Sequence, residues 1–435
     1  MASSFAALAK ATREHLPLLC DIAGTSGARL YSTVLSLATL MLTARWLGPE
    51  GRGVVVVVIT WVTLVSGIAH LSIGQVLVHR AANEPDQQWV GPALAAVVLI
   101  TGVASVAGCL VVAFCYVAFN ARLFVGIPAP ALALGFVALP FFIWEQYGSA
   151  LLSVLGMLRT YNGAQIIGRT LGLVILIVGI KLIGLGVYGF LVAWVTAQVI
   201  ISSTGGTVLV RHSRGRLSGG LNAAGWLIRD SLKLHLNAIG VLLFSGVDIL
   251  MLQYFRGPAE AAILQLPMQL FLAMLLVPQA AQLALQGRVA ARTKAEFWRE
   301  HRAVIAYVLA GMTLIAGALW LLAPWLVPLI GSQRFADSTT VFRILLFGVP
   351  CACFNTLMGI QWITRGYFYR VSLITLAAGL LNCALNFVLI PAYGANGAAG
   401  AAVVGICAVP LLANGWMACK AQREFIRSKA SNVRG

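Results

Sequence analysis

The sequence predicts an all-α integral membrane protein with about twelve transmembrane helices. Of its 435 residues, 60% are hydrophobic and only 10% are charged, whereas soluble chains carry about 25% charged residues. The apolar residues also lie in long runs of roughly 20, which match a hydrocarbon core about 30 Å thick at 1.5 Å of helix per residue. Because a chain in lipid must satisfy its backbone hydrogen bonds internally, these runs are expected to be helices.

The apolar runs and the basic segments between them predict how the chain crosses the membrane. With the N-terminus in the cytoplasm, 22 of the 30 Lys and Arg residues lie in inside segments and seven lie at outside ends. The positive-inside rule therefore favours a cytoplasmic N-terminus and a cytoplasmic C-terminus. The predicted spans are 18–44, 54–77, 90–119, 131–157, 164–184, 187–210, 226–254, 259–284, 303–330, 338–364, 370–391 and 396–418.

Charge and composition exclude several function classes. The net charge of +17 lies mainly in the inside segments, so membrane topology explains it and no nucleic-acid partner is expected. Neither the eight cysteines nor the six histidines show metal-ligand spacing, so no metal and no cofactor is predicted. Residues 184–189 match G-x-G-x-x-G without a preceding strand, and no Walker A sequence is present. We expect a protein that is not an enzyme.

An internal repeat divides the chain. Four landmarks recur 208 or 209 residues apart, which predicts two six-helix halves, residues 1–210 and 226–418. A basic cytoplasmic linker, 211–225, would join them, and a basic tail, 419–435, would follow. Because each half has an even number of spans, the pseudo-twofold axis would run along the membrane normal. The landmarks are Gly48-Pro49 with Gly257-Pro258, Asp21 with Asp230, Ser36 with Ser245, and the turns 186–189 and 394–397.

Polar side chains form a stripe along the first span and a weaker one along the seventh. At 100° per residue the first stripe occupies an arc of roughly 140° and the second an arc of about 120°. Since a polar stripe facing lipid is costly, both are expected to line a polar cavity between the halves. The stripes comprise Asp21, Thr25, Arg29, Ser32, Thr33, Ser36, Thr39 and Thr43, and Asp230, Ser231, Asn237, Ser245 and Asp248.

Charges at membrane depth are the strongest site candidates, because each costs at least about 2.5–3.5 kcal/mol to insert. Arg29, Glu145 and Asp248 qualify most clearly. The alternative is structural pairing: Arg29 with Asp248 or Asp21, and Glu145 with another partner. The candidate substrate-binding residues are Arg29, Ser36, Arg45, Arg52, Asn237 and Asp248, and the candidate coupling residues are Asp21, Glu145 and Asp248.

The remaining basic residues near span ends are interpreted by position. Arg45 and Arg52 lie at the outer end of the first hairpin, where they either contact substrate or anchor the chain at the interface. Arg169 and Lys181 are expected only to mark the ends of a span.

Three segments carry a family resemblance. Ala44-Arg45-Trp46-Leu47-Gly48-Pro49-Glu50-Gly51-Arg52-Gly53, with Leu71-Ser72-Ile73-Gly74-Gln75, resembles the first two spans of bacterial polysaccharide flippases. Those proteins belong to the multidrug/oligosaccharidyl-lipid/polysaccharide exporter superfamily, which includes the MATE transporters. Val247-Asp248-Ile249-Leu250-Met251 is similar to the seventh span of that family, and Leu389-Ile390-Pro391-Ala392-Tyr393-Gly394-Ala395-Asn396-Gly397-Ala398-Ala399 to its C-terminal pattern. Arg52 stands where an aromatic residue is usual.

The resemblance implies a MATE-like fold and a function. The substrate would be an oligosaccharide on a polyprenyl diphosphate carrier, flipped across the bacterial inner membrane for lipopolysaccharide or exopolysaccharide synthesis. Arg29, Arg45 and Arg52 would bind the diphosphate, and the hydroxyl stripe would bind the sugars as the halves rock. Expected partners are this lipid-linked substrate, membrane lipids, a polysaccharide polymerase and a chain-length regulator.

Two other functions stay open at the level of sequence. One is a cation-coupled drug or metabolite antiporter of the same superfamily, which would have an acid-lined aromatic cavity and few arginines. The other is a lipid-linked sugar polymerase or ligase. The short predicted outer loops argue against the second, since such enzymes carry a large external loop.

Overall fold

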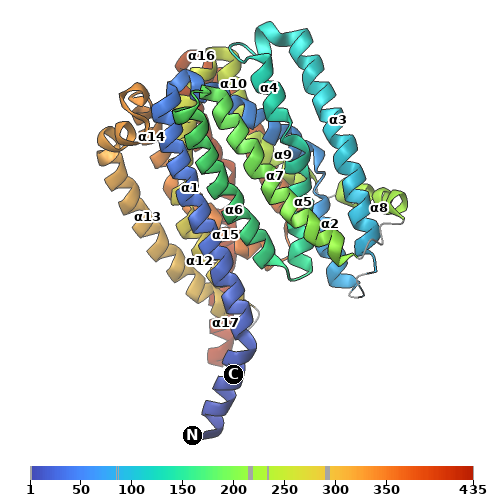
Figure 1. Cartoon of the computed structure of the whole chain (residues 1–435). Coiled ribbons are helices and arrows are strands. Elements are labelled where there is room, and N and C mark those ends of the chain that lie inside the picture. Colours follow the sequence, from blue (N-terminus) through green and yellow to red (C-terminus); the bar gives the residue numbers. More distant parts are fainter. Residues whose placement is uncertain are drawn as a thin grey trace. The chain divides into compact units, whose positions relative to one another are not determined.

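A computed structural model describes residues 2–84, 86, 88–213, 219–232, 235–289 and 294–434, and every regular element in these ranges is helical (Figure 1). Within the helices, some side chains fall outside the description, including those of residues 2–26, 29, 236–237, 245 and 428–434. The predicted all-α membrane fold is confirmed.

The membrane passes agree with the predicted spans. Among the described residues, nine helices are long and apolar enough to cross a membrane. A tenth pass is obtained when α14 (Ser338–Phe347) and α15 (Val349–Ile363), which are bent by 47° at their junction, are taken as one span. Two of the nine, 40 and 59 residues long, exceed the roughly 20 residues that one crossing needs. Gly48 (φ 66°) breaks the first and Gly394 (φ 55°) breaks the second, in a backbone region that glycine adopts without strain. Divided there, the ten stretches correspond to the twelve predicted spans.

The chain forms two compact units, and each is described separately. The first unit contains Met1–Thr39, Val65–Phe114 and Pro128–His235. Its helices are the first part of α1 (Ala2–Ala69), α2 (Ile73–Asn83), most of α3 (Val90–Leu123), α4 (Ala129–Phe136), α5 (Leu139–Val154), α6 (Leu158–Ile177), α7 (Gly186–His212) and α8 (Gly220–Leu232), with a π-helical turn at Val178–Leu182.

The second unit contains Leu40–Leu64, Cys115–Ile127 and Leu236–Gly435. Glycine allows α9 (His235–Ser245) and α16 (Phe368–Cys407) to pack closely, because a Cβ at Gly240 would lie 2.8 Å from the backbone nitrogen of Leu376. Besides the middle of α1, its helices are α9 (His235–Ser245), α10 (Val247–Arg256), α11 (Pro258–Met274), α12 (Leu276–Val289), α13 (Lys294–Gly331), α14 (Ser338–Phe347), α15 (Val349–Ile363), α16 (Phe368–Cys407) and α17 (Val409–Arg434), with a 3₁₀ turn at Gln333–Phe335.

The predicted halves, linker and tail, 1–210, 211–225, 226–418 and 419–435, remain predictions. Part of the linker, residues 214–218, lies outside the described residues. The tail continues α17 as far as Arg434.

Candidate functional site

A connected group of polar side chains in the first unit centres on the carboxylate of Glu145 on α5. Its Oε1 accepts hydrogen bonds from the Tyr161 hydroxyl at 3.0 Å and from Gln165 Nε2 at 2.6 Å. Its Oε2 accepts one from Gln198 Nε2 at 2.5 Å. Donors on α6 and α7 thus hold a carboxylate that lies within the candidate span Ala129–Val154. Such bonds offset the several kcal/mol that an unsatisfied charge costs there.

Arg169 extends this group from α6 to α1. Its Nε donates to Gln165 Oε1 at 2.8 Å, and a terminal nitrogen donates to Ser36 Oγ at 3.3 Å. A second link between these helices joins the Tyr31 hydroxyl and Thr170 Oγ1 at 2.8 Å. We call the linked residues the Glu145 network: Ser36, Glu145, Tyr161, Gln165, Arg169 and Gln198.

Close packing of α6 on α7 sets this geometry. A Cβ at Gly168 would lie 2.9 Å from the carbonyl oxygen of Ala197, and one at Gly172 would lie 2.9 Å from the Cβ of Ala197. Small residues at these positions let the two backbones approach. As a result, Gln165 on α6 and Gln198 on α7 both reach Glu145.

The guanidinium of Arg169 forms no ion pair among the residues that the structure describes. The residue is exposed, and no carboxylate among the described residues lies within ion-pair distance of it. Glu145 reaches it only through the amide of Gln165. An arginine carries five N–H donors, and the bonds to Gln165 and Ser36 use two of them. The network therefore presents a cation with free donors, the kind of group that binds phosphate.

In the second unit, Arg52 is buried beside the turn at Gly48. It donates to Thr43 Oγ1 and, at 2.7 Å, to Gln265 Oε1. A Cβ at Gly53 would overlap the carbonyl oxygen of Pro258, so this part of α1 lies against the start of α11. The bond to Gln265 joins the same two helices. In this conformation the Arg52 side chain braces a helix contact, and its role in substrate binding remains a prediction.

The other sequence candidates have separate surroundings. Arg45 is exposed and donates to the carbonyl oxygen of Leu329 near the end of α13. Asp248 is buried, and its Oδ1 accepts the backbone N–H of Ile249 at 2.8 Å in the first turn of α10. The side chains of Asp21, Arg29 and Asn237 lie outside the described residues. Of the sequence candidates, Ser36 and Glu145 are therefore the two that the structure joins in one network.

Comparison with known proteins identifies the family. A family profile described as "Polysaccharide biosynthesis protein" matches residues 18–281, which is more than half of the chain and includes the whole Glu145 network. The chain belongs to the polysaccharide biosynthesis protein family. No curated protein matches its sequence.

Solved transporter structures share the fold of this polysaccharide biosynthesis protein at low sequence identity. The lipid II flippase MurJ, in an inward closed conformation, aligns with a TM-score of 0.72 and 11% identity over 93% of this chain and 92% of that chain. An inward-facing multidrug resistance MATE family transporter of the MOP superfamily aligns with a TM-score of 0.71 and 14% identity, over 90% of this chain and 95% of that chain. A MOP superfamily transporter from Pyrococcus furiosus aligns with a TM-score of 0.54 and 14% identity over 94% of each chain. The family resemblance and the MATE-like fold are confirmed.

The sequence prediction for Arg169 was wrong. We expected this arginine to mark the end of a span, but the candidate span runs from Leu158 to Leu182 and encloses it. Its signal was present in the sequence: Tyr161, Gln165 and Arg169 are spaced four residues apart, which places them on one face of α6. Gln198 is another residue that we did not single out, and it lies in the middle of α7 near several other polar side chains, so its residue type alone does not distinguish it.

Proposed function

We propose that this polysaccharide biosynthesis protein flips polyprenyl-diphosphate-linked oligosaccharide units across the cytoplasmic membrane by alternating access. The observation that carries the proposal is the guanidinium of Arg169, which has no ion-pair partner among the described residues and lies within a candidate membrane span of a member of this family. A diphosphate accepts hydrogen bonds and carries negative charge, so it complements the free N–H groups of this side chain. The product would serve cell-surface polysaccharide synthesis.

The network suggests how the headgroup would be held. The bond from Arg169 to Ser36, at 3.3 Å, is longer than the other bonds of the network and hence the easiest for a phosphate oxygen to displace. Glu145 would stay bound to Gln165, whose Oε1 keeps the guanidinium oriented. The sugars would contact the hydroxyl stripe of the first span, while the polyprenyl chain stays in lipid.

The proposal includes a cellular setting. Both termini would lie in the cytoplasm of a bacterium, and the substrate would be loaded from that side. A polysaccharide polymerase and a chain-length regulator would use the flipped units. Lipopolysaccharide and exopolysaccharide pathways both fit this setting.

A cation-coupled drug or metabolite antiporter is the second candidate. Glu145 favours it, because carboxylates within membrane spans often serve in ion or proton pathways. Arg169 disfavours it for cationic drugs, since a positive charge with no ion-pair partner among the described residues repels them.

Deletion of the gene in its host separates the two candidates. A flippase predicts loss of the surface polymer and accumulation of lipid-linked oligosaccharide in the membrane, both reversed by the wild-type gene. An unchanged polymer together with increased drug sensitivity would support the antiporter and contradict the flippase.

A further inference from the structure

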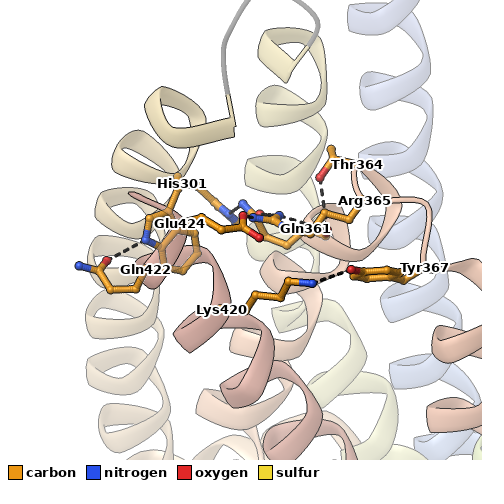
Figure 2. A network of polar contacts seen from close by, with 9 residues as sticks. His301, Gln361, Thr364, Arg365, Tyr367, Lys420, Gln422 and Glu424 are labelled. Atoms are coloured by element: carbon orange, nitrogen blue, oxygen red, sulfur yellow. Dashed lines mark hydrogen bonds and ion pairs between the residues drawn. The ribbon is translucent and has the colours of Figure 1, made fainter. Parts of the chain in front are cut away.

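A group of cations and aromatic rings lies where α16 begins and α17 passes position 420. Figure 2 shows Lys420 of α17 reaching Tyr367, and its Nζ donates to the tyrosine hydroxyl at 2.6 Å. Arg370 lies 4.7 Å from the centroid of the Tyr367 ring and 5.8 Å from that of Trp416. Lys420 lies 5.5 Å from the same Trp416 centroid. Two cations therefore share one pair of aromatic rings.

Neither cation is neutralised in the described part of the chain. No described carboxylate lies within ion-pair distance of Arg370 or Lys420, whereas the neighbouring Arg365 meets Glu424 at 2.9 Å. The hydrogen bond from Lys420 lowers the pKa of the Tyr367 hydroxyl; the charges of Lys420 and Arg370 act in the same direction, and desolvation and the charge of Glu424 oppose them without reversing the shift. The side chains around this ring thus create a local excess of positive charge.

The group offers hydrogen-bond donors with no acceptor to match. Lys420 uses one N–H on Tyr367 and keeps two, and the Tyr367 hydroxyl keeps its own proton to donate. Arg370 contributes up to five N–H groups. A ligand that only accepts hydrogen bonds and carries negative charge, such as a phosphate ester, fits this set of donors.

The surroundings of the group are those of a membrane surface. Arg370 and Trp416 lie at the ends of the predicted spans 370–391 and 396–418, and tryptophan is enriched at membrane–water interfaces. Trp416 is 48% exposed, and Leu412, one turn earlier on α17, is 76% exposed. A lipid could place its phosphate between the cations and an acyl chain along Leu412. Free phosphate would use only the charged part of this surface.

We propose that Tyr367, Arg370, Trp416 and Lys420 form a binding site for the phosphate headgroup of an anionic phospholipid. Basic residues next to a membrane span attract anionic lipids through charge, and the aromatic pair adds a rigid apolar wall. The bound lipid would link the start of α16 to α17. The site belongs to the second unit and does not depend on the proposed flippase activity.

Native mass spectrometry of the purified full-length protein tests the site. Wild type, the double variant Arg370→Gln/Lys420→Gln and the control Arg343→Gln are titrated in detergent with phosphatidylglycerol, phosphatidylcholine or inorganic phosphate. Arg343 is a matched control because, like Lys420, it is half-buried, and it lies 4.5 Å from a tryptophan ring, that of Trp320. We expect phosphatidylglycerol to bind wild type and control equally, and the double variant roughly tenfold more weakly. Phosphatidylcholine should bind all three weakly and alike.

Three results would overturn the proposal. One is equal binding of phosphatidylglycerol by wild type and the double variant, and another is an equal loss in the Arg343→Gln control. The third is displacement of the lipid by inorganic phosphate at equal concentration, which would assign the site to free phosphate. If the double variant does not fold, Tyr367→Phe keeps the ring and removes one donor. A two- to threefold weaker binding of phosphatidylglycerol is then expected, and unchanged binding would contradict the proposal.

Discussion

The Glu145 network and the Arg365 cluster, which consists of His301, Gln361, Arg365 and Glu424, share one local arrangement but differ in what the arginine binds. In each, a glutamine lies four residues before an arginine on one helix or at its end, and the arginine donates to the glutamine Oε1: Arg169 to Gln165, and Arg365 to Gln361. The carboxylates are placed differently. Glu424 meets Arg365 directly at 2.9 Å (Figure 2), whereas Glu145 meets the glutamine of its pair.

The two arginines also differ in burial. The Arg365 side chain is only 6% exposed and closes an ion pair with Glu424. Gln361 donates to His301 Nδ1 at 2.6 Å, and His301 Nε2 lies 3.1 Å from the carbonyl oxygen of Leu357. Arg169 is exposed and has no carboxylate partner in the described residues. The position of one carboxylate therefore decides whether the arginine holds helices together or stays available to a ligand.

Replacing Arg169 by alanine should have the largest effect on transport. A hydrogen bond to a charged group contributes about 1.5–3 kcal/mol, so we expect surface polymer in a gene-deleted host to fall roughly 10- to 100-fold. Arg169→Lys should restore part of it, because the charge remains without the planar donors. The measurement is polymer per cell at equal membrane levels of each variant. Full export by Arg169→Ala would remove this residue from the site.

Replacing Glu145 by alanine should chiefly lower stability. Gln165, Gln198 and Tyr161 would lose their shared acceptor, and an orphaned buried donor costs about 1–3 kcal/mol. We expect a lower melting temperature in detergent, and reduced transport because Gln165 no longer orients Arg169. A melting temperature equal to that of wild type would contradict the arrangement. Glu145→Gln keeps the shape of the side chain, so its melting temperature should lie between those of wild type and Glu145→Ala.

Replacing Glu424 by glutamine should have the smallest effect. It breaks the ion pair with Arg365, but the carboxylate is 40% exposed, so solvent screening limits the loss to about 1 kcal/mol or less. We expect a small decrease in melting temperature and unchanged transport per molecule. A loss of transport as large as that of Arg169→Ala would show that the closed cluster is part of the transport site.

The sequence predicted the spans and their breaks better than it predicted the site. Apolar runs and turn residues such as Gly48 and Gly394 depend on local chemistry, and each of these two helix breaks lies where the sequence predicts a turn. Glu145 was identified because a charge at membrane depth is costly in any tertiary fold. Its partners Gln165 and Gln198 come from α6 and α7, which approach through Gly168 and Gly172. The Gly-x-x-x-Gly spacing of these two glycines favours close helix packing, but it does not specify which helix packs there or which side chains meet Glu145.

The prediction for Arg169 failed for a related reason. The apolar run after residue 163 made this arginine look close to the start of a span. In the structure, α6 begins at Leu158, so more than two helical turns precede Arg169. The residues in those turns, Tyr161 among them, are polar enough to suggest a loop, yet the Glu145 carboxylate on α5 satisfies the Tyr161 hydroxyl.

The most direct test is translocation in vesicles of purified protein, using a fluorescent polyprenyl-diphosphate-linked oligosaccharide and a membrane-impermeant quencher. Wild type and Arg365→Ala, at equal amounts of folded protein, should translocate the lipid at the same rate. Arg169→Ala should translocate it roughly 10- to 100-fold more slowly. Equal rates for Arg169→Ala and wild type, or no protein-dependent translocation at all, would contradict the assignment of this guanidinium to the diphosphate.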